Sequence, residues 1–197
     1  MTKILIESNK KIKRKISVKK DEIIYIFGKS GGDLDLEIQI AKPGVDAKVY
    51  GVLIGQRDHL FNINITSNHM SESTKSRVHL KTICFDNSKI NFSGMIKINK
   101  KAQLSDAYLQ NDNIIVGENA VVNSSPQLEI EADDVKASHG VTIKTLDDVS
   151  MYYLQSRGLV AKEAENLLLQ GFISDITTMA DVKISLSSLI EPAANNE

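Results

Sequence analysis

The apolar pattern of this chain changes its period once, near Thr145, and the change separates two kinds of secondary structure. Before Thr145, apolar and polar residues alternate in short runs, which is the pattern of half-buried strands. Such runs include Leu34, Leu36, Ile38 and Ile40, then Ile63 and Ile65, then Ile96 and Ile98, then Leu128 and Ile130. After Thr145, apolar residues recur at helical spacing. The sequence therefore predicts an all-β core with an α-helical C-terminus.

The strand-like runs recur roughly every ten residues, a spacing typical of a β-sandwich, a β-barrel or a β-solenoid. Turn residues separate them, as in Gly31-Gly32-Asp33 and Asp86-Asn87-Ser88. No strict repeat is visible, so the spacing alone does not choose among these architectures. Several asparagines fit the corners of stacked coils and fit ordinary turns equally well; they are Asn62, Asn64, Asn87, Asn91, Asn111, Asn113, Asn119 and Asn123.

Two helices are expected after this change of period, with a weaker third. Asp147 or Asp148 caps the first helix, and Gly158 supplies the left-handed residue that ends it. The second helix covers Ala161–Ile176 and carries an apolar stripe of Ala164, Leu167, Leu168, Phe172 and Ile176. The third covers Met179–Ile190.

These patterns divide the chain into a β core (residues 1–144), a helical segment (145–190) and a flexible tail (191–197). The chain is 42% hydrophobic and 25% charged, as in ordinary globular proteins, and its net charge of -1 indicates neither a nucleic-acid nor a membrane partner. No apolar run is long enough to span a bilayer, and the first residues lack the apolar core of a secretory signal. We therefore expect a cytoplasmic protein.

The sequence contains no recognisable catalytic motif, so we expect a protein that is not an enzyme. Gly28-Lys29-Ser30-Gly31-Gly32 is too short for a phosphate-binding P-loop and is expected to form a turn. Cys84 is the single cysteine and follows a strand pattern, in which a cysteine usually acts as a small buried hydrophobe. His139 lies at the junction of the two regions, and a neutral imidazole can bind a metal, but one ligand does not make a site.

Two stretches closely resemble the SufB/SufD family of iron–sulfur cluster assembly subunits. Residues 126–140 (PQLEIEADDVKASHG) resemble the end of the family's β-helix, and residues 152–158 (YYLQSRG) resemble the start of its terminal helices. Phe92–Ile98 is a weaker match. The resemblance implies a right-handed parallel β-helix followed by two to three helices. It is closest to SufD, because the scaffold cysteine of SufB would fall near Asn111 and its histidine between two glutamates would fall at Ile130.

The resemblance also implies a role: a non-catalytic, SufD-like subunit of a cytoplasmic iron–sulfur cluster assembly complex. In this family the terminal helices dock SufC, an ABC-type ATPase, which predicts docking residues Tyr152, Tyr153, Leu154, Arg157, Gly158 and Phe172. The last strands pair with a SufB-like subunit or a second copy, which predicts interface residues Glu129, Glu131, Lys136 and His139. The chain alone is expected to bind no cofactor firmly. Iron or a cluster at the interface with a partner would use His139 as a metal ligand.

Two other functions fit parts of the sequence. A standalone homodimeric β-helix protein without an assembly role would present the same binding surfaces. A β-helical polysaccharide hydrolase would need clustered carboxylates, and Asp33, Asp35 and Glu37 do alternate along one strand face. These three lie in a polar stretch near a turn, where solvated carboxylates are common.

Overall fold

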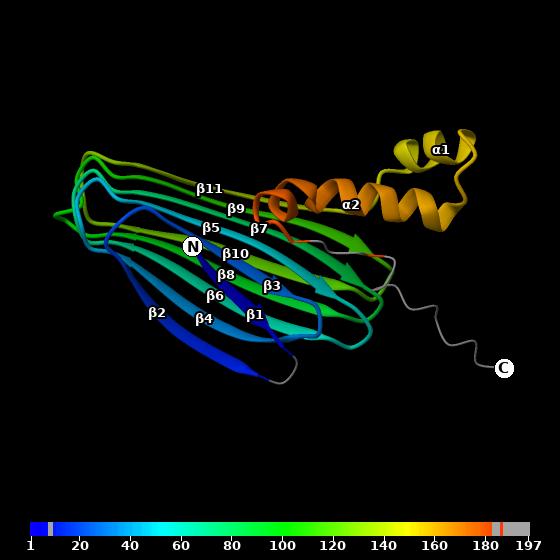
Figure 1. Ribbon diagram of the computed structural model, residues 1–197, viewed down its shortest axis with the longest axis horizontal. Coiled ribbons are helices and arrows are strands. Elements are labelled where there is room, and N and C mark those ends of the chain that lie inside the picture. Colours follow the sequence, from blue (N-terminus) through cyan, green and yellow to red (C-terminus); the bar gives the residue numbers. More distant parts are fainter. Residues whose placement is uncertain (8–9, 183–185, 187–197) are drawn as a thin grey trace. The chain divides into compact units, whose positions relative to one another are not determined.

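The computed structural model describes residues 1–7, 10–182 and 186, which form eleven strands and two helices (Figure 1). The chain divides into two compact units, Met1–Ile143 and Lys144 onward. The strands are β1 (Thr2–Ile6), β2 (Lys11–Val18), β3 (Glu22–Gly28), β4 (Gly32–Ile40), β5 (Asp46–Gly55), β6 (Leu60–His69), β7 (Lys75–Phe85), β8 (Lys89–Ile98), β9 (Asp106–Val116), β10 (Val121–Ile130) and β11 (Lys136–Lys144). The helices are α1 (Asp148–Ser156) and α2 (Ala161–Met179).

Odd-numbered and even-numbered strands form two separate layers (Figure 1). One sheet has the order β1-β3-β5-β7-β9-β11, and the other has the order β10-β8-β6-β4-β2. Neighbouring strands are parallel, and residues paired across them are one coil apart, as in Thr2 with Ile24, Gly32 with Phe61 and Lys89 with Val121. The chain therefore winds as a parallel β-solenoid whose coils lengthen toward its C-terminal end. This confirms the predicted solenoid and excludes the sandwich and the barrel.

The core lies between the two sheets and is built from the inward side of each alternating strand. Leu34 and Leu36 of β4 stack on Ile63 and Ile65 of β6, and all four are at most 1% exposed. Because neighbouring strands are parallel and in register, equivalent side chains of successive coils lie over one another. Cys84 belongs to this core and is fully buried, as predicted.

Two columns of left-handed residues turn the chain at the corners of the solenoid. The columns are Gly44, Ser73 and Leu104 on one side, and Arg57, Asp86 and Gly117 on the other. In the first column the Ser73 N–H donates to the Gln103 carbonyl (2.8 Å) and the Leu104 N–H donates to the Asp134 carbonyl (2.6 Å). Each of these corners is therefore hydrogen-bonded to the next coil. These bonds keep the same corner conformation in successive coils, although most of the corner residues are not glycine.

The helical unit follows the predicted boundaries at its start. Asp147 caps α1, since its Oδ2 accepts a hydrogen bond from the Ser150 N–H (2.8 Å), and Gly158 adopts a φ of 98° just after the helix. This cap lowers the pKa of Asp147 through bonds from the Ser150 hydroxyl and the Ser150 backbone N–H. Of the two helices in the described part of the chain, neither is both long and apolar enough to span a membrane.

The apolar stripe predicted for the second helix is partly wrong. The buried residues of α2 are Ala164, Leu169, Ile173 and Ile176, whereas Leu167 is 51% exposed. Three consecutive leucines occupy positions 167–169, and periodicity alone placed the wrong one inward. The helix also continues to Met179, three residues beyond the predicted end. Most of the third helix predicted for Met179–Ile190, and the tail predicted for 191–197, lie outside the described residues.

Candidate functional site

The two ends of the solenoid differ in what they present. At the first end, β2 is the last strand of its sheet, and its register pairs Ile12 with Leu34, Arg14 with Leu36 and Ile16 with Ile38. Arg14 therefore occupies a position equivalent to buried core residues, and it is exposed. An inward-directed charge on an edge strand opposes the stacking of a further strand. At this end β2 thus carries a charge that opposes pairing of its sheet.

Two lysines of β2 form ion pairs with carboxylates of the neighbouring strand β4. Lys13 lies 3.5 Å from Asp35 and Lys15 lies 3.1 Å from Glu37, measured from Nζ to the carboxylate oxygen. Asp33 accepts a hydrogen bond from Asn62 Nδ2 (2.8 Å). Each of the three carboxylates considered for a hydrolase is therefore bonded to a side chain of a neighbouring strand.

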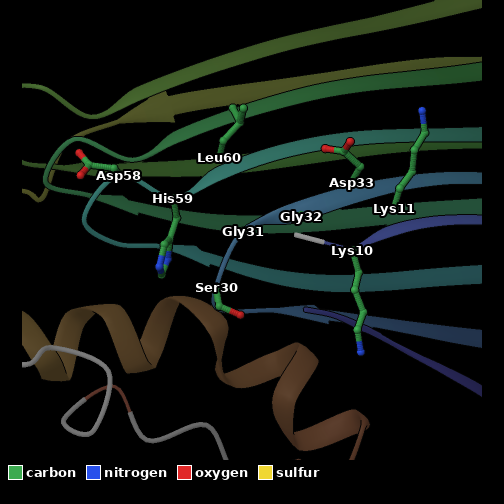
Figure 2. A pocket seen from close by; sticks show the side chains of 9 residues that line it. All are labelled: Lys10, Lys11, Ser30, Gly31, Gly32, Asp33, Asp58, His59 and Leu60. Atoms are coloured by element: carbon green, nitrogen blue, oxygen red, sulfur yellow. The ribbon is translucent and has the colours of Figure 1, made fainter. Parts of the chain in front are cut away.

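A pocket of about 340 Å³ also lies at the first end, where three turns meet (Figure 2). It is lined by Lys10, Lys11, Ser30, Gly31, Gly32, Asp33, Asp58, His59 and Leu60. Gly31 and Gly32 have φ of 76° and 130°, so the glycine-rich stretch forms the turn between β3 and β4. Two lysines and two aspartates share this pocket, and this mixture of charges favours no one class of ligand.

At the opposite end, the strands β10 and β11 leave apolar core positions uncovered. We call this region, formed by β10 and β11, the open end. Leu128 and Ile130 of β10 are 38% and 42% exposed, although the residues paired with them in the preceding coil, Ile96 and Ile98, are fully buried. Val141 and Ile143 of β11 are 36% and 48% exposed. An apolar surface of this kind is typical of an interaction site.

His139 faces the interior side of this open end. On β11 the Thr142 hydroxyl donates to Asp112 Oδ1 (2.8 Å) on the outer face of the sheet. Because successive side chains of a strand point to opposite faces, the odd-numbered residues of β11, including His139, point inward. His139 is exposed and shares its side of the strand with Val141 and Ile143. Within residues 1–7, 10–182 and 186, no group of three or more His, Cys, Asp or Glu side chains could hold a metal ion.

The other predicted interface residues surround the same end. Glu129 lies on the outer face of β10 and bonds to Lys97 Nζ (2.5 Å), which raises the pKa of Lys97. Glu131 directly follows β10, and Lys136 begins β11. The structure thus gathers all four residues at the open end, but only His139 points inward. The apolar residues beside it were not among the predicted interface residues, although the alternation of the last two strands could have indicated them.

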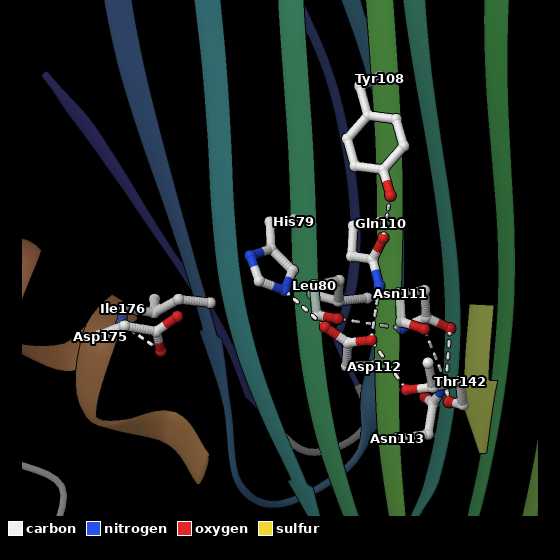
Figure 3. Close-up of polar contacts among 10 residues, drawn as sticks. All are labelled: His79, Leu80, Tyr108, Gln110, Asn111, Asp112, Asn113, Thr142, Asp175 and Ile176. Carbon is white, nitrogen blue, oxygen red and sulfur yellow. Dashed lines mark hydrogen bonds and ion pairs between the residues drawn. The ribbon is translucent and has the colours of Figure 1, made fainter. Parts of the chain in front are cut away.

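A polar cluster fixes the outer face of the sheet beneath β11. Figure 3 shows His79, Gln110 and Thr142 converging on Asp112. His79 Nε2 lies 2.8 Å from Asp112 Oδ2, and Gln110 Nε2 donates to Asp112 Oδ1 (2.6 Å). Burial acts to raise the pKa of Asp112, but the bonds from Thr142, Gln110 and His79 outweigh it and lower the pKa. The sequence did not indicate this cluster, because its members come from three separate coils.

Three of the predicted docking residues, Tyr152, Tyr153 and Arg157, are exposed on or just after α1. Tyr152 is 75% exposed and Tyr153 is 55% exposed. The Arg157 guanidinium carbon lies 5.2 Å from the centre of the Tyr153 ring, within cation–π range. Leu154 and Phe172 are partly buried. Tyr152, Tyr153 and Arg157 are residue types enriched at interaction hot spots, and they lie together at the end of α1.

Comparisons with known proteins point in one direction. A family model described as the SufBD core domain of SUF-system FeS cluster assembly matches residues 15–172. The iron–sulfur cluster assembly protein SufD of Escherichia coli (strain K12) is 38% identical over 109 residues, which cover 55% of this chain and 26% of that protein. SufD of Bacillus subtilis (strain 168) is 28% identical over 143 residues, covering 71% of this chain and 33% of that protein. An iron–sulfur cluster assembly SufBD family protein of Synechocystis is 35% identical over 125 residues, covering 64% and 27%. The chain thus spans about a quarter to a third of these relatives' length.

Proposed function

Because the chain belongs to the SufBD family of iron–sulfur cluster assembly proteins, we propose that it acts as a SufD-like, non-catalytic subunit of such an assembly complex. In this role the open end pairs with another SufBD-type chain, and α1 and α2 dock an ABC-type ATPase. The curated relatives are iron–sulfur cluster assembly proteins, which supports the general role.

The asymmetry between the two ends of the solenoid carries the pairing proposal. The first end places the charged Arg14 at a core position, whereas the open end exposes Leu128, Ile130, Val141 and Ile143. Covering exposed apolar surface contributes about 25 cal/mol per Å² to association, so the open end gains from a partner. Both β10 and β11 are also the last strands of their sheets, and an unpaired strand edge invites another strand.

Iron or a cluster under assembly would be cargo at this interface rather than a resident cofactor. His139 is exposed at the open end, and a neutral imidazole is a common ligand for iron. In this proposal the remaining ligands come from the paired chain. The contribution of this chain would be to hold one imidazole at a defined place on a rigid strand.

The docking proposal rests on the exposed end of α1. The Arg157 guanidinium lies over the Tyr153 ring, so the two side chains present a cationic group and an aromatic ring side by side. Val149 and Val160, which are 75% and 63% exposed, add apolar surface near it in the chain. Such a surface suits a protein partner with an acidic or polar groove lined by apolar side chains.

Co-purification with the SufC-type ATPase of the same organism tests the proposal. The variant Tyr153→Ala plus Arg157→Glu should lose the complex, since both members of the stacked pair are removed. A matched control, Leu104→Ala plus Lys101→Glu, changes an exposed apolar residue and a charge at a corner of the solenoid and should keep the complex. Absence of a complex with the unmodified chain would reject the docking role. A standalone homodimer would then be the better account of the open end.

A further inference from the structure

The outer face of the sheet β10-β8-β6-β4-β2 carries uncharged polar side chains on three neighbouring strands. They alternate with inward-facing residues and therefore point away from the core. The parallel register aligns them in two columns, which are Asn62, Asn91 and Asn123 in the first and Asn64, Ser93 and Ser125 in the second. All six residues line an open hollow of about 620 Å³. We call this surface the amide face.

The first column of the amide face is held in place by its own hydrogen bonds. Asn91 Nδ2 donates to Asn62 Oδ1 (2.9 Å), and Asn123 Nδ2 donates to Asn91 Oδ1 (2.8 Å). A side-chain amide has two N–H donors and an oxygen with two lone pairs, so Asn91 keeps one donor and one lone pair for a ligand. Groups that are already fixed lose little freedom when a ligand binds them, which favours binding.

The second column is available to a ligand. Within the part of the chain that the structure describes, the side chains of Asn64, Ser93 and Ser125 have no hydrogen-bond partner. Amide and hydroxyl groups both donate and accept. Neighbouring strands lie about 4.8 Å apart, so the column repeats such groups at that spacing across the sheet. A ligand that repeats its own polar groups could therefore bond to each strand in turn.

The electrostatics of the amide face favour a neutral ligand. No charged side chain of the described residues lines the hollow. The nearest charges lie to its sides as pairs: Lys13 is 3.5 Å from Asp35, and Lys97 is 2.5 Å from Glu129. Met95 follows Ser93 on the same face of β8 and is partly buried, so it adds a soft apolar contact beside the polar columns.

We propose that the amide face binds a neutral oligosaccharide that lies across β6, β8 and β10. Sugar hydroxyls donate and accept hydrogen bonds and recur with each sugar unit, which matches the columns, and the C–H face of a sugar ring matches Met95. The activity is binding and not hydrolysis, because the nearest carboxylates on β4 are already bonded, Asp33 to Asn62 and Asp35 to Lys13. This inference goes beyond the assembly role and does not depend on it.

Titration of the ¹⁵N-labelled chain with cellohexaose, followed by amide chemical shifts, tests the proposal. The expected result is a saturable shift of residues on β6, β8 and β10, without comparable shifts on β11. A few net hydrogen bonds to a solvent-exposed surface correspond to a dissociation constant of about 1 mM.

A double variant in the second column measures the contribution of the free groups. Asn64→Ala plus Ser93→Ala should raise the dissociation constant at least about tenfold, because two hydrogen bonds to the ligand are removed. The matched control, Asn119→Ala plus Ser17→Ala, makes the same changes at two exposed positions outside the hollow and should change the constant less than about twofold. Circular dichroism checks that both variants keep the strand content of the unmodified chain.

Several results would overturn the proposal. One is the absence of a saturable shift up to about 10 mM cellohexaose, and another is an equal loss of affinity in the variant and its control. Tighter binding of the acidic oligosaccharide tetragalacturonate would show that the surface does not select a neutral ligand. Tighter binding of a serine- and asparagine-rich peptide would assign the amide face to polypeptides instead. Co-purification with the ATPase is a separate measurement, so failure here leaves the assembly role standing.

Discussion

His69 should make the stability of the solenoid depend on pH. The residue is fully buried, its Nδ1 lies 2.8 Å from Thr74 Oγ1, and its Nε2 lies 2.8 Å from Ser76 Oγ. Thr74 Oγ1 lies 2.9 Å from the Ser105 hydroxyl of the next coil. A neutral imidazole donates from one nitrogen and accepts at the other, so both contacts are satisfied without a charge. Burial, and next the charge of Arg77, lower the pKa of His69 from 6.5 to about 4.

The lowered pKa sets the sign and size of the effect. Between pH 6.5 and about 4 the folded chain binds fewer protons at His69 than the unfolded chain does, so stability falls as the pH falls through this window. The full stabilisation is present above the unfolded pKa. At 1.36 kcal/mol for each pKa unit, the shift amounts to roughly 3 kcal/mol, of which about 2 kcal/mol is lost between pH 7 and pH 5.

Urea unfolding at pH 7 and pH 5, followed by circular dichroism, measures this loss. The comparison is between the unmodified chain and His69→Gln, because glutamine keeps a polar side chain but does not titrate. On lowering the pH, the unmodified chain should lose about 2 kcal/mol more than the variant. His59→Gln serves as the control, since His59 is only partly buried and should leave most of the effect in place. Equal losses in the unmodified chain and His69→Gln would refute the reasoning.

Two further predictions concern backbone strain and the outer polar cluster. Leu104 has a φ of 60° and is 60% exposed, so Leu104→Gly should stabilise the chain by about 1 kcal/mol, whereas Gly44→Ala at the equivalent corner should destabilise it by about as much. Thermal unfolding of both variants checks this, and shifts of the same sign would contradict it. Asp112→Asn weakens three side-chain bonds at once and should cost about 1–3 kcal/mol in urea unfolding at pH 7. Thr142→Val removes one of those bonds and should cost less; an equal cost would show that the cluster does not act through Asp112.

Local pattern predicted the strands but not the coil. Alternation in a run such as Leu34–Ile40 identifies the inward face, because each side chain in a strand points opposite to its neighbours. The sequence repeat could not be detected for two reasons. The coils lengthen along the chain, so the repeat has no fixed period. Of the six left-handed corner positions, only Gly44 and Gly117 are glycines. At Ser73 and Leu104, backbone hydrogen bonds to the next coil stabilise the corner. Such bonds do not depend on residue type, so the sequence does not indicate them.

Asparagines show a different limit of sequence reasoning. Asn62, Asn91 and Asn123 were predicted at corners or turns, but they lie within β6, β8 and β10. Asn62 Oδ1 accepts from Asn91 Nδ2 (2.9 Å), and Asn91 Oδ1 accepts from Asn123 Nδ2 (2.8 Å). The row begins at Asp33, which accepts from Asn62 (2.8 Å). Amides are favourable in these strands only because a like amide lies one coil away, which a local window cannot detect.

At the open end, the sequence predicts which side chains point inward but not whether another coil covers them. Leu128 and Ile130 alternate in the sequence as Ile96 and Ile98 do, yet the first pair is 38% and 42% exposed and the second pair is fully buried. No local property distinguishes the pairs; the difference is that a described coil stacks on one and not on the other. Alternation could also have placed His139 on the same side of β11 as its apolar neighbours. That an imidazole lies among uncovered core residues follows only from the position of β11 at the edge of its sheet, and this arrangement is what the pairing proposal rests on.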